Sequence, residues 1–95
     1  MEFNIEEKAR NSIIKNGGNL IIKKEIDHTW KGFIHRLRSE AGDKTKSTKF
    51  YDVYQYQGIK IFIDKTLKTA NQIQIELQSD LPLLGPSFTI KGIAI

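Results

Sequence analysis

The second half of the chain alternates apolar and polar residues with the period of a β-strand. In residues 71–78, Ile73, Ile75 and Leu77 occupy every second position, and polar side chains fill the positions between them. This is the pattern of a strand with one face in a core and the other in water. A chain that repeats it over much of its length is constrained to build a sheet, which excludes an all-helical fold.

Three further segments follow from the same pattern. Residues 49–56 and 58–64 lie on either side of Gln57-Gly58, which predicts an antiparallel hairpin. Residues 87–95 predict a closing strand. Residues 79–86, with two prolines and a glycine, predict the loop that precedes it.

The first half predicts one helix and one clear strand. Apolar residues at helical spacing indicate a helix over residues 5–15, with Asn4 as N-cap, Glu7 closing a capping box and Gly17-Gly18 ending it. Residues 2–5 predict a short opening strand, and residues 19–26, rich in branched side chains, predict a longer one. Residues 27–48 show no sustained period, apart from a partial strand near 31–37.

These elements predict one domain over residues 1–95, of the α+β class and mainly β. We expect one N-terminal helix packed on short, twisted, mixed β-strands. The predicted core consists of Ile5, Ala9, Ile13, Leu20, Ile22, Val53, Ile61, Ile63, Ile73, Ile75, Leu77, Leu84, Phe88 and Ile90.

Two segments of the second half resemble a known family. Gly58–Asp64 reads GIKIFID, and Leu83–Lys91 reads LLGPSFTIK after an intervening alternating strand. This order resembles the HesB-like family, which includes the A-type iron–sulfur cluster carriers. The amino-acid sequence of Tyr51–Lys60 and of Ile90–Ile93 is most similar to that of small HesB-like proteins with a Cys-Cys or Cys-selenocysteine motif. The resemblance implies the HesB-like fold over nearly the whole chain.

The chain departs from those carriers because it contains no cysteine. The resemblance implies that carrier ligands follow the second strand and sit near the C-terminus, which correspond here to Ile26–Gly32 and Ile93–Ile95. Iron–sulfur clusters need thiolate sulfur, so we expect no cofactor and no metal, and no cluster-carrier activity. The missing thiols also exclude disulfides and a cysteine nucleophile.

No catalytic constellation replaces the missing cysteines, so the sequence predicts a protein that is not an enzyme. Gly17-Gly18 follows a helix instead of opening one, which is the wrong polarity for a phosphate-binding loop. His28 and His35 are the only histidines. Imidazole suits several transition metals, but two histidines without a metal-binding spacing are better interpreted as partly exposed polar residues beside Trp30.

The positive charge is concentrated in one segment. The formal net charge is +4, and residues 31–49 hold six basic and two acidic residues, which equals the whole excess. A solvated loop explains this, and so does a surface for a polyanion or a partner. The residues predicted for such a contact are Trp30, Lys31, Arg36, Arg38, Lys44, Lys46 and Lys49.

Two functions remain open from the sequence. One is a cysteine-free HesB-like protein that acts through contacts with an unknown protein partner. The other is a small basic module that binds nucleic acid or another polyanion. We expect a cytoplasmic protein without a membrane contact, because no apolar run reaches the roughly 20 residues of a membrane span and the N-terminus has no signal-like segment. The apolar end Ile93–Ile95 either completes the core or joins a second copy in a homo-oligomer.

Overall fold

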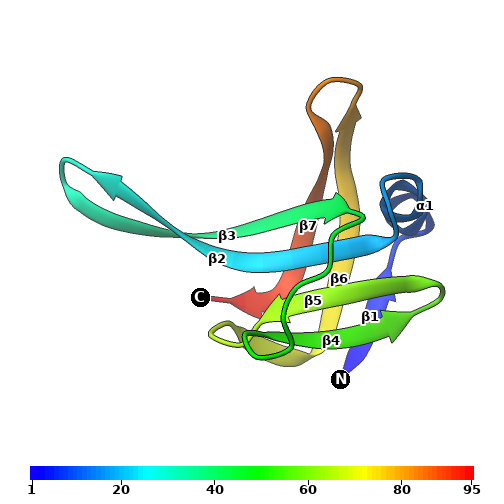
Figure 1. The fold of residues 1–95 in the computed structure, drawn as a ribbon, viewed down its shortest axis with the longest axis horizontal. Coiled ribbons are helices and arrows are strands. Elements are labelled where there is room, and N and C mark those ends of the chain that lie inside the picture. Colours follow the sequence, from blue (N-terminus) through cyan, green and yellow to red (C-terminus); the bar gives the residue numbers. More distant parts are fainter.

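The computed structural model describes all 95 residues as two mixed β-sheets and one helix. The elements follow the chain as β1 (Glu2–Ile5), α1 (Glu7–Lys15), β2 (Asn19–Thr29), β3 (Gly32–Gly42), β4 (Tyr51–Tyr56), β5 (Ile59–Asp64), β6 (Lys68–Leu81) and β7 (Gly85–Ala94). One sheet has the order β1-β6-β7 and the other β3-β2-β5-β4 (Figure 1). The predicted class, α+β and mainly β, is confirmed.

Each sheet combines one parallel pair with antiparallel pairs. In the smaller sheet β1 runs parallel to β6, and β7 returns antiparallel to β6. In the larger sheet β2 runs parallel to β5, while β3 and β4 are antiparallel to their neighbours. The predicted hairpin turn at Gln57-Gly58 is confirmed. Both residues take positive φ, at 42° and 88°, as a type I′ hairpin turn requires.

One apolar core joins the helix to both sheets. Ala9 and Ile13 of α1, Leu20 and Ile22 of β2, and Ile73 and Ile75 of β6 are completely buried. They belong to one cluster with the inward side chains of β5, Ile59, Ile61 and Ile63. Since isoleucine both favours strands and fills this core, local propensity and burial act in the same direction.

Two residues predicted for the core are exposed. Val53 is 38% exposed because Tyr54 and Tyr56 occupy the inner face of β4, where they pack near Phe3 at ring-centroid distances of 5.3 and 6.3 Å. Alternation then turns Val53 outward. Leu84 is 81% exposed because it lies in the turn between β6 and β7.

The remaining core prediction is close but incomplete. Leu77 and Ile90 are only partly buried, and both pack against the core. Five buried apolar residues were not predicted: Ile59, Leu67 and Ile93 in the core cluster, and Ile21 and Phe62 outside it. Ile93 therefore completes the core, which is one of the two roles expected for the apolar end of the chain.

The predicted capping box is wrong. Asn4 lies inside β1 and pairs with Gln74, so the helix begins at Glu7 and Glu6 stands at its N-cap without a side-chain cap. The Glu6 N–H donates to the Ile75 carbonyl at 2.9 Å, and Leu77 N–H donates to the Glu6 carboxylate at 3.3 Å. The helix start is thus fixed by β6. The predicted end at Gly17-Gly18 holds, with Gly18 N–H donating to Ile13 O at 2.8 Å.

The strands before and after residue 30 are longer than predicted. β2 continues to Thr29 and pairs with β3 residue by residue, from Asn19 opposite Gly42 to Thr29 opposite Gly32. The turn consists of Trp30 and Lys31, and Gly32 follows it at φ 122°. Similarly, β6 and β7 extend into the predicted loop 79–86 and leave only residues 82–84 as a turn.

The β6–β7 pair is interrupted at Gly92, where the two backbones approach closely. The register shifts between Thr69 and Gln74, and Gly92 takes φ 95° there. A Cβ atom on Gly92 would lie 2.3 Å from the carbonyl oxygen of Gln72. Only glycine fits this backbone contact.

We predict that Gly92→Ala destabilises the fold strongly, by about 2–4 kcal/mol, because it adds both a backbone clash and an unfavourable φ. Urea unfolding of the purified variant measures this. Gly42→Ala is the matched control, because a Cβ there meets no atom within 4 Å and no positive φ is involved. Equal unfolding midpoints for the two variants would show that the close contact at Gly92 does not exist.

Candidate interaction surface

The outer part of the β2–β3 hairpin projects from the body of the protein (Figure 1). β2 pairs with β5 only over Asn19–Ile22, so from Lys23 to Thr29 its single pairing partner is β3. We call the two-stranded part formed by residues 24–37 the arm. A two-stranded ribbon is marginally stable in water when nothing covers it. The arm is therefore the part of the fold that most lacks a packing partner.

One face of the arm, together with the adjoining residues of β2 and β3, carries paired charges. The side chains of Lys23, Glu25 and Asp27 point to the same side as those of Arg36, Arg38 and Glu40, because residues opposite each other in the register share a face. They form three diagonal ion pairs: Lys23 with Glu40 at 3.6 Å, Glu25 with Arg38 at 2.7 Å and Asp27 with Arg36 at 3.0 Å. The hydrogen bond from Arg38 lowers the pKa of Glu25, although some desolvation opposes it.

The opposite face of the arm is uncharged beyond Lys24. It carries Ile26 and His28 from β2, and Phe33 and His35 from β3. Phe33 lies opposite His28, with their rings edge to face at a centroid distance of 4.7 Å. Ile26 is 50% and Phe33 66% exposed. We call these four residues the arm face.

The arm face lies on the same side of β2 and β3 as the core, with Lys24 between Ile22 and Ile26. Leu20 and Ile22 of β2 are fully buried on the same side, and Leu37 and Ala41 of β3 pack against the core. At the tip, Trp30 is 90% exposed, and Lys31 Nζ lies 4.9 Å from the centre of its indole ring. Exposed aromatic groups of this kind are enriched where proteins bind one another.

Asp64 holds the root of the arm. It ends β5 at the point where β2 leaves the sheet, and its carboxylate accepts a hydrogen bond from Lys24 N–H at 3.4 Å. The same carboxylate accepts bonds from the Thr66 N–H at 2.9 Å and the Thr66 hydroxyl at 2.8 Å. Partial burial acts to raise the pKa of Asp64, but the bonds from Thr66 and Lys24 outweigh it, so the pKa is lowered.

The residues predicted for a polyanion or partner contact do not form one patch. Trp30 and Lys31 form the arm tip, and Arg36 and Arg38 lie on the charged face in ion pairs. Lys44, Lys46 and Lys49 lie at the other end of β3, in the connection that follows Gly42. Nearness along the chain suggested one cluster, whereas the length of β3 separates the tip from the connection.

The two histidines lie on the same face, as the register shows, since His28 stands opposite Phe33 and His35 opposite Ile26. The structure contains no group of three or more potential metal ligands. It also contains no helix with the length and apolar character needed to cross a membrane.

A second exposed apolar tip was not predicted as a site. The β6–β7 turn exposes Leu81, Leu83 and Leu84, with Leu83 98% exposed. The sequence signal for this tip was the three leucines within residues 81–86. The two prolines and the glycine beside them are typical of an ordinary loop, so the segment was not predicted as a site. This tip belongs to the other sheet and projects separately from the arm (Figure 1).

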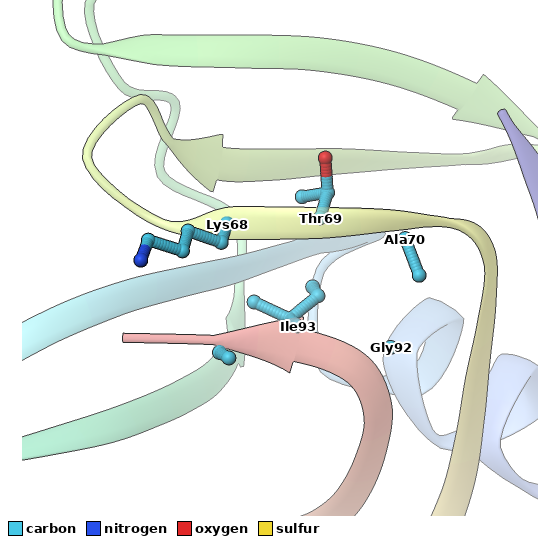
Figure 2. A pocket seen from close by; sticks show the side chains of 6 residues that line it. Lys68, Thr69, Ala70, Gly92 and Ile93 are labelled. Carbon is cyan, nitrogen blue, oxygen red and sulfur yellow. The ribbon is translucent and has the colours of Figure 1, made fainter.

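The largest hollow lies beside the irregular stretch of β6 and β7. It has a volume of about 420 Å³ and is lined by Lys68, Thr69, Ala70, Gly92, Ile93 and Ala94. Figure 2 shows the Ile93 side chain pointing toward β6 and the Thr69 hydroxyl pointing away from Ile93. Its lining offers one charged group, Lys68, and no acid–base pair.

Comparison with known families matches residues 1–85 to the CC/Se motif containing family. The chain belongs to this family. The crystal structure of Escherichia coli SufA, a protein involved in the biosynthesis of iron–sulfur clusters, is similar in fold. The TM-score is 0.50 and the identity 16%, and the match covers 96% of this chain and 80% of that chain. No curated protein sequence matches.

The chain belongs to the family but lacks the motif after which the family is named. The family name refers to a CC/Se motif, and this chain has no cysteine. The family match and the similarity in fold confirm the resemblance to small HesB-like proteins of this motif type. Of the stretches that the resemblance assigned to carrier ligands, residues 26–32 lie in the outer arm, and residues 93–95 cover the end of β7 and the residue that follows it. They lie in different sheets.

We predict that Asp64→Asn destabilises the protein at neutral pH by about 1 kcal/mol and that the effect disappears in acid. The folded state lowers the pKa of Asp64 below its ordinary value of 3.8. Its stabilisation is therefore complete above that value and is lost as pH falls through the lower folded-state pKa. Thermal unfolding at a series of pH values measures the difference.

The exposed Asp52 on β4 provides the control. Asp52→Asn removes the same formal charge without touching the root of the arm. If it lowers stability as much as Asp64→Asn, the effect is one of net charge and the hydrogen bonds at Asp64 contribute nothing.

Proposed function

We propose that this chain is a non-enzymatic member of its family that acts through protein contacts and carries no iron–sulfur cluster. The observation that carries the proposal is the arm, a projecting ribbon with one uncovered apolar face and an exposed Trp30 at its tip. Large aromatic side chains dominate the binding energy of protein interfaces. Trp30 and Phe33 are therefore the proposed anchors of the contact.

The absence of thiolates supports the second half of the proposal. Cysteine sulfur holds iron–sulfur clusters, and even clusters with two histidine ligands keep cysteines on the other iron. This chain offers His28 and His35 and no cysteine. A family relationship and a fold similar to SufA are thus compatible with a function that no longer involves holding a cluster.

We predict that anaerobic reconstitution with iron and sulfide leaves the protein colourless and without stoichiometric iron. The visible absorbance spectrum and elemental analysis after desalting measure this. A stable brown protein with near-equimolar iron would contradict the prediction, and loss of that iron in His28→Gln and His35→Gln would then identify the ligands.

The contact role is tested by quantitative capture from cells of the source organism. The immobilised protein is compared with the double variant Trp30→Ser, Phe33→Ser, and captured proteins are quantified by mass spectrometry. Leu83→Ser is the matched control, since it removes an even more exposed apolar side chain from the other hairpin tip. We expect a partner that the arm variant loses at least about tenfold and the control retains.

Binding of a polyanion has less support from the structure than a contact with a protein. Arg36 and Arg38 are already paired with Asp27 and Glu25. Four of the predicted basic residues, Lys31, Lys44, Lys46 and Lys49, make no ion pair, and they are split between the tip and the connection after β3. Retention on heparin with steep loss as salt rises would favour this alternative over the protein contact.

A further inference from the structure

We propose that the free edge of β2 binds an extended peptide in which basic and apolar residues alternate, as an added strand of the larger sheet. The inference rests on the proposed function, because it names the kind of protein segment that the arm would contact. It concerns the backbone of β2 from Lys24 to His28, where β5 has ended and the arm projects alone (Figure 1). We call this stretch the β2 edge.

The β2 edge carries backbone groups that no strand of the fold binds. β5 pairs with β2 as far as Ile22, and beyond this residue only β3 pairs with β2. The two-residue turn of Trp30 and Lys31 makes Thr29 and Gly32 the hydrogen-bonded pair that closes the hairpin. Because these groups alternate in direction along a strand, the odd-numbered residues of β2 bond to β3 and the even-numbered ones point to the β2 edge.

A hydrogen bond at the root of the arm supports this direction. The N–H of Lys24, an even-numbered residue, donates to the Asp64 carboxylate at the end of β5. Asp64 therefore occupies the first donor beyond the point where β5 stops pairing. The next groups in the same row are the N–H and C=O of Ile26 and of His28. A peptide that continues the line of β5 would bond to them as an added strand.

The side chains beside this edge determine which peptide fits. A strand added to β2 directs its side chains alternately to the two faces of the arm. Its neighbours on the charged face are Glu25 and Asp27, and its neighbours on the arm face are Ile26 and His28. Opposite charges on adjacent strands stabilise a sheet, and like charges destabilise it. The peptide therefore needs basic residues beside the two carboxylates and an apolar residue between them, beside Ile26.

The ion pairs with β3 leave both carboxylates able to bind a second cation. Glu25 pairs with Arg38 and Asp27 with Arg36, in both cases across the hairpin. The side chain of Glu25 nevertheless remains 33% exposed and that of Asp27 38%. A carboxylate has several acceptor sites, so a basic residue of the added strand would bind on the side away from β3. Positive, negative and positive charges would then alternate across three strands.

The same charges distinguish the β2 edge from the other edge of the arm and from a second β2 edge. The outer edge of β3 is flanked on the charged face by Arg36 and Arg38, which favours an acidic strand. Two β2 edges side by side would bring the carboxylates of one copy beside those of the other. A basic, alternating peptide fits the β2 edge better than either, and it supplies the third strand that a two-stranded ribbon lacks.

Hydrogen exchange measured by NMR tests the inference in the unmodified protein. In the free protein the amides of Ile26 and His28 should exchange fast, whereas those of Glu25 and Asp27, which bond to β3, should exchange more slowly. The probe is a synthetic peptide of about seven residues that alternates arginine with valine. Saturation with this peptide should slow exchange at Ile26 and His28 at least about tenfold.

Control peptides separate strand addition from simple attraction between charges. One has the same composition with its arginines grouped at one end, and another has glutamate in place of arginine. Fluorescence anisotropy should give dissociation constants at least about tenfold higher for both. N-methylation of one alternate set of peptide residues should abolish binding, and methylation of the other set should not, because only one edge of the peptide bonds to β2.

Ile26→Pro is the matched change in the protein. It removes an N–H that points to the β2 edge and no hydrogen bond to β3, so the arm should remain folded. Ile26→Ala is its control, since it shortens the side chain and keeps the N–H. We expect Ile26→Pro to raise the dissociation constant at least about tenfold above that of Ile26→Ala. Circular dichroism checks the fold, and the peptide comparison decides the inference if Ile26→Pro does not fold.

Four results would overturn the inference. The first is slow exchange of Ile26 and His28 in the dilute free protein, because the edge would then already be occupied. The second is assembly of the protein without peptide that protects these two amides, because the occupant would then be a second copy. The third is equal affinity for the alternating and the grouped peptide. The fourth is equal affinity for the arginine and the glutamate peptide.

The result also separates this inference from the proposed function. If the arginine peptide does not bind, but a protein is captured through Trp30 and Phe33, the inference fails and the contact role stands. If the peptide protects Ile26 and His28, but no capture depends on Trp30 and Phe33, the inference stands and the proposed anchors fail. If neither occurs, both proposals fail.

Discussion

The parallel pairing of β2 with β5 over Asn19–Ile22 is the contact on which the rest of the larger sheet depends. These residues include Leu20 and Ile22, which are fully buried against Ile61 and Ile63 in the core shared by helix and sheets. They are also the only part of the β2–β3 hairpin that pairs with another strand of the sheet. Because the pairing stops after Ile22 while β2 continues to Thr29, the fold ends in a ribbon with no cover.

That geometry explains why the two faces of the ribbon differ so strongly. Near the body, one side is core and the other meets solvent, and the same alternation continues outward along both strands. On the solvent side it produces cross-strand ion pairs, which contribute little to stability individually but keep that face soluble and unattractive to other strands. On the core side it leaves Ile26 and Phe33 exposed beyond the point where the body can cover them. The arm is thus a continuation of the core into solvent.

The chain keeps the fold of its family without the cysteines of the family motif. The fold is retained over nearly the whole chain, while the cysteines that the family name refers to are absent. The stability of the fold needs none of them, because the isoleucine core, the close contact at Gly92 and the β2–β5 pairing are built from other residues. The fold therefore does not depend on cysteine, and its most prominent exposed apolar feature is the arm.

The sequence alone determined the elements whose signal is local. The period-two alternation at Ile73, Ile75 and Leu77, the Gln57-Gly58 turn and the glycines after the helix each fix their own few residues, and the structure has the corresponding elements in these places. The absence of cysteine likewise decided which ligands the chain lacks. Only the tertiary structure decided the rest. It showed that Arg36 and Arg38 are partners of Asp27 and Glu25, that Val53 faces outward, and that Ile26 and Phe33 lie beyond the body. These facts depend on which strands are neighbours, at what register and over what length, and such long-range pairing leaves no trace in the local pattern of residues.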